Sequence, residues 1–198
     1  MNIGLTGGIA TGKSTVSSML VRKGALLVDA DVIAREVMLP GHPVLAEVAA
    51  HFGQDILQTD GQLDRKKLGE IVFNDPKERL ALNGITHPAI RREIRRQMEA
   101  YEKSNPEQLV VVDIPLLYES ELQSLFHKVM VVYVPRKTQL QRLMERDRLT
   151  EEQAKARLDS QMDIEQKKRM ADYVIDNSGS MAETERQLDE LWPRITRP

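Results

Sequence analysis

The N-terminal segment contains Gly7-Gly8-Ile9-Ala10-Thr11-Gly12-Lys13-Ser14. This is a complete Gly-x-x-x-x-Gly-Lys-Ser phosphate loop, and it lies between a short apolar run and an amphipathic helical pattern. A strand, a loop and a helix in that order form the context in which such a loop binds the phosphates of a nucleotide. The segment therefore predicts a site for a nucleoside triphosphate.

The residue types of the loop suit phosphate binding. Glycines let successive backbone N–H groups turn toward one anion, and the N-terminus of the following helix adds a partial positive charge. Lys13 can reach the β- and γ-phosphates, and the hydroxyl of Ser14 is a ligand for Mg²⁺. We therefore expect a nucleoside triphosphate and Mg²⁺ at this loop, with Lys13 acting on the β- and γ-phosphates.

Composition narrows the classes of partner. The chain has 198 residues and a formal net charge of −2, and only 4% of its residues are aromatic, which argues against nucleic acid as the main partner. There are no cysteines, which excludes disulfides and thiolate metal sites. We see neither a signal-peptide pattern nor an apolar run long enough to span a membrane, so we expect a cytoplasmic protein with no membrane partner.

Five short segments of β-forming residues punctuate the chain, and several are continuous apolar runs. Such runs are typical of strands that are buried on both faces of a parallel sheet. Helical patterns separate them, so the sequence predicts an α/β fold of the three-layer P-loop NTPase type, with a five-stranded parallel sheet flanked by helices. The expected strands are Asn2–Leu5, Ala25–Asp29, Leu109–Asp113, Val129–Val134 and Tyr173–Asp176.

Two stretches are too long to be simple connections between strands. Residues 35–104 have helical patterns with a polar turn near Asp60-Gly61, and we interpret them as an inserted helical lobe over the edge of the sheet. Residues 136–168 are dense in charge and lack a strand pattern, which indicates a helical lid. The nucleotide-binding core then comprises residues 1–34, 105–135 and 169–198.

Polar residues follow the second expected strand, at the sheet edge where open α/β sheets bind ligands. Asp29 ends this strand, Asp31 follows it, and Arg35 lies one helical turn beyond Asp31. A carboxylate beside the γ-phosphate accepts or orients the proton of an attacking hydroxyl. We assign that catalytic role to Asp31, and we expect Asp29 to cap the helix or to lie behind a Mg²⁺ ion.

The third expected strand ends in Asp113, as a Walker B strand does, but this signal is weak alone and leaves the role of Asp113 open. No Glu follows Asp113, which favours transfer to a substrate over hydrolysis. In the expected lid, Arg142 and Arg146 are four residues apart, so that one can neutralise transferring phosphate while the other packs on the base. The alternative is a solvated charged face. Asn177, after the last strand, is expected near the adenine or ribose.

Four arginines gather on one predicted helix whose start is marked by His87-Pro88. A solvated face explains them, and a site for a phosphorylated or pyrophosphate-bearing substrate is the alternative. His87 has either a structural or a catalytic role, and a lone histidine is more often structural. The arginines are Arg91, Arg92, Arg95 and Arg96.

These motifs together resemble the dephospho-CoA kinase family, nearly from end to end of the chain. The most specific are Asp29-Ala30-Asp31-x-x-Ala34-Arg35 and Pro115-Leu116-Leu117-x-Glu119, because phosphate loops alone are shared by many families. The others are the loop from Thr6 to Ser14, His87-Pro88 and Val174-Ile175-Asp176-Asn177.

The resemblance implies transfer of the γ-phosphate of ATP to the ribose 3′-hydroxyl of dephospho-CoA, the last step of coenzyme A synthesis. It implies that Asp31 is the base and that Arg142 lies in the lid near the nucleotide, with Arg146 as a further nucleotide contact. The residues implied to wrap the phosphates are Ala10, Thr11, Gly12, Lys13, Ser14 and Thr15. The lobe of residues 35–104 is implied to receive the acceptor, and the residues implied to bind it are Arg35, His87, Leu117 and Glu119.

Three alternatives stay open. A kinase of the shikimate or nucleoside type has the same loop and an acidic group after the second strand. A nucleotide switch is less favoured, because the chain has no Asn-Lys-x-Asp motif to read guanine, and a nucleic-acid-remodelling ATPase is opposed by the charge balance. The expected protein is a monomer or a small homo-oligomer.

Overall fold

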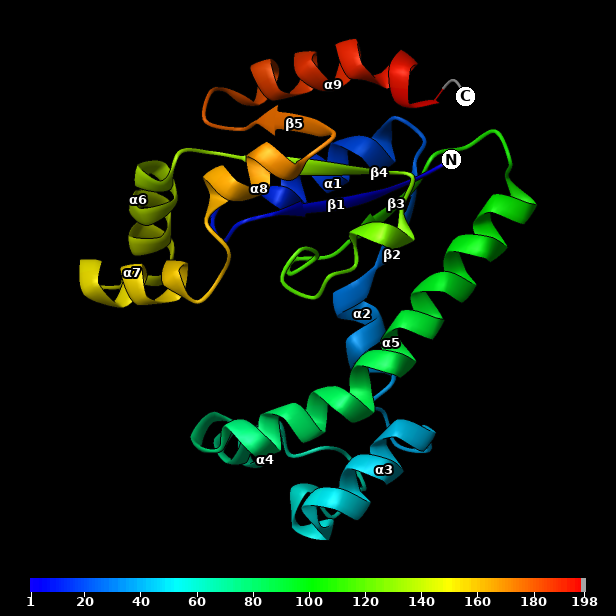
Figure 1. The fold of residues 1–198 in the computed structure, drawn as a ribbon, viewed down its shortest axis with the longest axis vertical. Helices are drawn as coiled ribbons and strands as arrows, with labels where there is room; N and C mark the ends of the chain where they lie inside the picture. Colours follow the sequence, from blue (N-terminus) through cyan, green and yellow to red (C-terminus); the bar gives the residue numbers. More distant parts are fainter. Residues whose placement is uncertain (197–198) are drawn as a thin grey trace. The chain divides into compact units, whose positions relative to one another are not determined.

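The computed structural model describes residues 1–196, so the last two residues of the expected core segment 169–198 lie outside the described residues. The strands are β1 (Asn2–Gly7), β2 (Leu26–Asp29), β3 (Val110–Asp113), β4 (Lys128–Tyr133) and β5 (Tyr173–Asp176) (Figure 1). The helices are α1 (Lys13–Arg22), α2 (Ala30–Glu36), α3 (Pro43–Phe52), α4 (Arg65–Asn74), α5 (Pro76–Ser104), α6 (Arg136–Asp147), α7 (Glu151–Asp159), α8 (Ile164–Met170) and α9 (Met181–Thr196). Two short 3₁₀ helices are η1 (Gln54–Ile56) and η2 (Gln123–Leu125).

The strands form one sheet in the order β2-β3-β1-β4-β5. β1 pairs in parallel with β3 and β4, and β4 pairs in parallel with β5. The predicted fold class is confirmed, and each strand begins and ends within two residues of its predicted bounds. Because β1 is the central strand, the loop that follows it lies at the middle of the carboxyl edge of the sheet.

The two faces of the sheet are covered differently. On one face, Ile3 and Leu5 of β1 are buried in a core cluster with residues of α1 and α9, among them Val16 and Leu188. On the other face, a Cβ added to Gly4 would lie 2.6 Å from side-chain carbons of Leu117 and of Phe126. The segment after β3 therefore packs so closely on the central strand that only glycine fits there.

Asp29–Gln97 forms a compact unit of its own, separate from the unit made by Met1–Val28 and the chain from Met98 onward. The inserted unit contains α2, α3, α4 and most of α5. Its turn is confirmed near Asp60-Gly61, where Gly61 has a φ of 82° and Leu57 bridges Leu63 in an antiparallel pair. The assignment of residues 35–104 as a substrate lobe stays a prediction.

The expected helix start at His87-Pro88 is wrong. Pro88 lies inside the 29-residue helix α5, which begins at Pro76. Proline removes one helical hydrogen bond and crowds the carbonyl four residues earlier, which bends a helix more often than it ends one when the flanking turns pack well. Figure 1 shows that α5 changes direction part-way along its length.

The segment expected to be a lid contains α6, α7 and most of α8. The C-cap residue of α6 is Arg148, which has a left-handed φ of 53°, and α7 begins with a capping box in which Thr150 and Gln153 bind each other's backbone. α6 and α7 share a small core of Leu143, Ala154 and Leu158, and the partly buried Ile9 and Ala10 of the phosphate loop pack against it.

Among the described residues, none of the helices combines the length and apolar character that a membrane span requires.

Candidate active site

The phosphate loop runs from the end of β1 to the start of α1. Gly12, the N-cap residue of α1, has φ and ψ of 78° and 29°, and Ala10 has a φ of 61°. These left-handed residues turn the backbone sharply before the helix. In the described chain no side chain caps α1, so the first N–H groups of this helix are available to an anion.

The loop lysine is held by a carboxylate at the same sheet edge. The Nζ of Lys13 forms an ion pair with Asp113, which ends the neighbouring strand β3. The Asp113 side chain is 10% exposed and that of Lys13 is 19% exposed. Asp113, whose role the sequence leaves open, thus orients Lys13 at the carboxyl end of the sheet.

Asn177 supports the loop from behind. Its Nδ2 donates to the carbonyl of Thr11 at 2.8 Å, and its Oδ1 accepts from the hydroxyl of Thr184 at 2.8 Å. Arg142 donates from its guanidinium to the carbonyl of Asn177 at 2.9 Å. Both polar atoms of the amide are therefore engaged inside the protein, and the contacts of Asn177 and Arg142 with a nucleotide stay predictions.

Two glutamines that were not predicted from the sequence form hydrogen bonds with the backbone of Ile9. The Nε2 of Gln139 donates to the Ile9 carbonyl at 2.9 Å, and the Ile9 N–H donates to Oε1 of Gln161 at 3.0 Å. Gln139 is buried at 4% exposure. An amide within a charged helical pattern has no signal of its own, so only the fold reveals that Gln139 faces inward.

Gln139 also explains Gly8, which the phosphate-loop pattern leaves unspecified. Gly8 is not among the residues with positive φ, but a Cβ added to it would overlap Nε2 of Gln139. We expect Gly8→Ala to displace this amide from Ile9 and to weaken nucleotide binding by about tenfold, because small misplacements of a binding loop are costly. Titration with a fluorescent ATP analogue measures this change.

Gly69→Ala is the matched control for that substitution. Gly69 lies in α4, and an added Cβ there meets nothing within 4 Å. The control should bind the analogue as the parent does. Unchanged affinity in Gly8→Ala would show that the loop does not depend on the Gln139 contact.

Of the roles predicted for the residues after β2, the helix cap at Asp29 is confirmed, and the catalytic role of Asp31 stays a prediction. Asp29 Oδ1 accepts from the N–H groups of Asp31 at 2.9 Å and Val32 at 3.1 Å, so the predicted helix cap is confirmed. The Asp31 carboxylate is exposed and forms no ion pair within the described chain. Arg35, one turn later, is exposed too. The carboxylate of Asp31 is therefore open to a substrate.

Three other predicted residues have protein partners or are buried. Arg146 donates to Asp147 at 2.8 and 3.2 Å, and this carboxylate raises the pKa of Arg146. Leu117 is fully buried beneath Gly4, which makes it a core residue. Glu119 accepts from Lys167 at 2.9 Å. The role of Lys167 was not predicted from the sequence, because the charged sequence of its helix is typical of a solvent-exposed surface.

His87 lies half-buried on α5 in the inserted unit. Burial lowers the pKa of His87, and the positive charge of Arg91 lowers it further. Within the arginine cluster, Arg96 binds Glu93 through two hydrogen bonds of 2.7 and 2.8 Å. Because Arg96 is already paired with Glu93, we interpret it as part of a solvated helix face and not of a phosphate-binding site.

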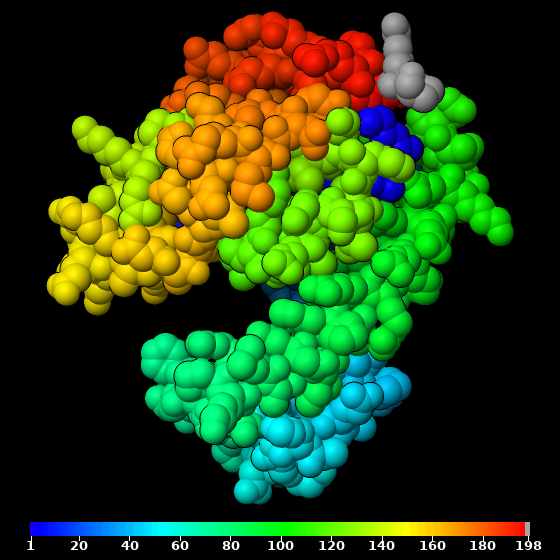
Figure 2. Space-filling view, viewed as in Figure 1, coloured from blue at the N-terminus to red at the C-terminus, as the bar shows by residue number. Residues whose placement is uncertain are grey.

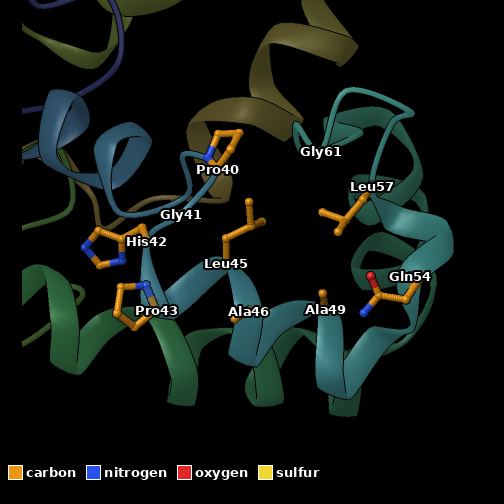
Figure 3. A pocket seen from close by; sticks show the side chains of 10 residues that line it. All are labelled: Pro40, Gly41, His42, Pro43, Leu45, Ala46, Ala49, Gln54, Leu57 and Gly61. Atoms are coloured by element: carbon orange, nitrogen blue, oxygen red, sulfur yellow. The ribbon is translucent and has the colours of Figure 1, made fainter.

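The inserted unit has a pocket of about 420 Å³ between α3 and the turn that follows it (Figure 3). Leu45 of α3 and Leu57, which follows η1, both extend their side chains toward it. The volume is within the range of about 300–1,000 Å³ that small-molecule sites occupy. The lining residues are Pro40, Gly41, His42, Pro43, Leu45, Ala46, Ala49, Gln54, Leu57 and Gly61.

Comparisons with known proteins agree with this arrangement. The dephospho-CoA kinase from Bacillus cereus is 52% identical over 189 residues, which cover 96% of this chain and 94% of the relative. The solved dephospho-CoA kinase from Campylobacter jejuni is 37% identical with a TM-score of 0.77, and the match covers 98% of this chain and 96% of that one. The shikimate kinase from Aquifex aeolicus, at 15% identity, a TM-score of 0.52 and coverage of 98% and 96%, shares the fold alone. The model of the family described as dephospho-CoA kinase matches residues 1–183, from the strand before the phosphate loop to the first turn of α9, and the chain belongs to that family.

Proposed function

We propose that this chain transfers the γ-phosphate of ATP to the ribose 3′-hydroxyl of dephospho-CoA, giving coenzyme A and ADP. The observation that carries the chemistry is the phosphate loop, whose open helix N-terminus lies beside Lys13 and Asp113. The family match over residues 1–183 supports dephospho-CoA as the acceptor and ATP as the donor.

The loop binds and neutralises the phosphates. The N–H groups from Ala10 to Thr15 surround the β- and γ-phosphates, and Lys13 moves from Asp113 to the phosphate that is transferred. Arg142 and Arg146 would add positive charge from α6. Catalysis of this kind depends on placing charge where the transition state needs it.

Mg²⁺ fits the start of α1. Ser14 is exposed there, and the described residues contain no group of three or more His, Asp or Glu side chains that would hold a metal. An ion that relies on one hydroxyl, phosphate oxygens and water is typical of Mg²⁺ with a nucleotide. When bound, it neutralises charge on the β- and γ-phosphates.

Asp31 takes the role of the base. The 3′-oxygen forms a bond to the γ-phosphorus, the bond from that phosphorus to the β–γ bridging oxygen breaks, and the hydroxyl proton passes to the Asp31 carboxylate. Its exposure leaves the carboxylate available to an incoming hydroxyl. Because Asp29 caps α2 through the Asp31 N–H, the backbone of the base is fixed.

The inserted unit receives the acceptor in this proposal. Its apolar pocket beside α3 suits the uncharged part of a long substrate, and the arginines of α5 suit phosphate groups. Arg35 and His87 belong to the same unit. The predicted contacts of Glu119 and Leu117 with the acceptor lie outside this unit, and in the structure Glu119 pairs with Lys167 while Leu117 is buried.

A panel of acceptors tests the proposal. The chain is incubated with ATP and Mg²⁺ plus dephospho-CoA, shikimate, a nucleoside or no acceptor, and ADP and phosphorylated product are measured. We expect product only with dephospho-CoA, and loss of turnover when Mg²⁺ is chelated. ADP without coenzyme A in the dephospho-CoA reaction, or faster product formation with another acceptor, would contradict it.

A further inference from the structure

Lys167 has an environment that few lysines have. Its side chain is fully buried, whereas its neighbour Lys168 is exposed. α8 lies at the surface in the space-filling view (orange in Figure 2), so the lysine must extend inward to be buried. A buried ammonium is tolerated only where it is paired and hydrogen-bonded, and its partners therefore indicate its role.

The partners of Lys167 join three parts of the nucleotide-binding unit. Its Nζ donates to the Gly7 carbonyl at 2.8 Å and to the Pro115 carbonyl at 3.5 Å, and lies 2.9 Å from Oε2 of Glu119. The ammonium, which has three donors, thus lies against two backbone carbonyls and one carboxylate. Gly7 ends β1 and Pro115 follows β3, so one side chain ties together the ends of two adjacent strands.

The Gly7 carbonyl belongs to a series. The carbonyls of Gly7, Ile9 and Thr11, at alternate positions of the phosphate loop, each accept a hydrogen bond from a side chain of another element. A loop that is held by its carbonyls keeps its shape before the ligand arrives, and preorganised donors need no rearrangement when they stabilise an anion.

We infer that Lys167 is a positioning residue for phosphoryl transfer, which acts on ATP only through the Gly7 carbonyl and Glu119 by holding the start of the phosphate loop in its binding shape. This inference rests on the proposed function. The geometry is that of a buried ion pair against the loop, and no contact with ATP is required.

The electrostatics of the site agree with this role. Burial lowers the pKa of Lys167, the ion pair with Glu119 opposes that change, and the positive charge of Lys13 lowers the pKa further. The two lysines are therefore close enough to interact. Glu119 limits the cost of burying the Lys167 ammonium against the loop.

The test compares variants that keep or remove the buried charge. Lys167→Met leaves Glu119 without its cation and is expected to lose stability, so Lys167→Met/Glu119→Gln removes both charges at similar volume. Lys167→Arg keeps the charge and the donors. Lys168→Met is the matched control, because it makes the same change on an exposed neighbour whose ammonium lies over the Tyr133 ring.

ATP-analogue affinity and kcat are measured only on variants whose thermal melting shows a cooperative unfolding transition. Affinity for a non-hydrolysable ATP analogue, without acceptor, should fall about tenfold in the double variant, and kcat with dephospho-CoA should fall about 10²-fold, as for other misplacements of catalytic groups. Lys167→Arg should recover most of both values, and Lys168→Met should match the parent.

A folded double variant with parental ATP affinity and kcat would overturn the inference, and so would a folded Lys167→Arg as impaired as Lys167→Met. Failure of the proposed function gives a different result. In that case the parent chain binds the ATP analogue but does not convert dephospho-CoA, while the effect of Lys167 on ATP affinity persists.

Discussion

Replacing Asp31 with Asn is expected to lower kcat for coenzyme A formation by about 10²–10⁴-fold, the usual contribution of a general base. Asn keeps the size of the side chain but cannot accept the proton of the 3′-hydroxyl. The Asp31 carboxylate is exposed and forms no ion pair in the part of the chain that the structure describes, so the exchange removes no native ion pair. ATP affinity and the melting temperature should therefore stay close to those of the parent.

Steady-state kinetics, binding of an ATP analogue and thermal melting measure these three quantities. Glu36→Gln is the control, because Glu36 is an exposed carboxylate on the same helix α2 and has no assigned role. It should keep full turnover. Near-normal kcat in Asp31→Asn would remove Asp31 from the mechanism.

The second large effect is expected for Lys13→Met. Removing a preorganised cation from a site of developing negative charge costs about 10²–10³ in kcat, as the loss of one oxyanion donor does. ATP affinity should fall too, because in the proposed function Lys13 binds the phosphates in the ground state as well as in the transition state. Asp31→Asn should change kcat alone, so the two variants are told apart by their ATP affinities.

Lys23→Met controls for loss of a lysine from the same helix. Lys23 caps the C-terminus of α1, and its ammonium pairs with the largely exposed Asp189. An ion pair of that kind contributes little, so turnover and ATP affinity should stay at parental values. If Lys13→Met instead kept its kcat and ATP affinity, phosphate transfer would not take place at this loop.

The fold was predictable because its signals are local. A strand buried on both faces must be a continuous apolar run, as Val110–Asp113 is until its last residue, and a phosphate loop needs its glycines and lysine at fixed spacing. The cap at Asp29 was predictable for the same reason, since it depends on residues two and three positions away.

The side chains that hold the phosphate loop, by contrast, reach it from distant parts of the chain. Lys167 lies 160 residues from Gly7, and Gln139 lies 130 residues from Ile9. No periodicity of a single helix distinguishes a buried lysine or glutamine from an exposed one. Pro88 was misleading in another way, because proline commonly marks a helix start, and only tertiary packing decides that α5 continues through it.

The shared core of α6, α7 and the phosphate loop has a consequence for local stability. Because Ile9 and Ala10 pack against the cluster that includes Leu143 and Leu158, separating the helix pair from the sheet would expose apolar side chains of the loop to water. We therefore expect α6 and α7 to separate from the sheet in the same cooperative step in which the phosphate loop loses its structure, with one opening free energy for both. A nucleotide that binds the loop would therefore also slow the hydrogen exchange of backbone amides in α6.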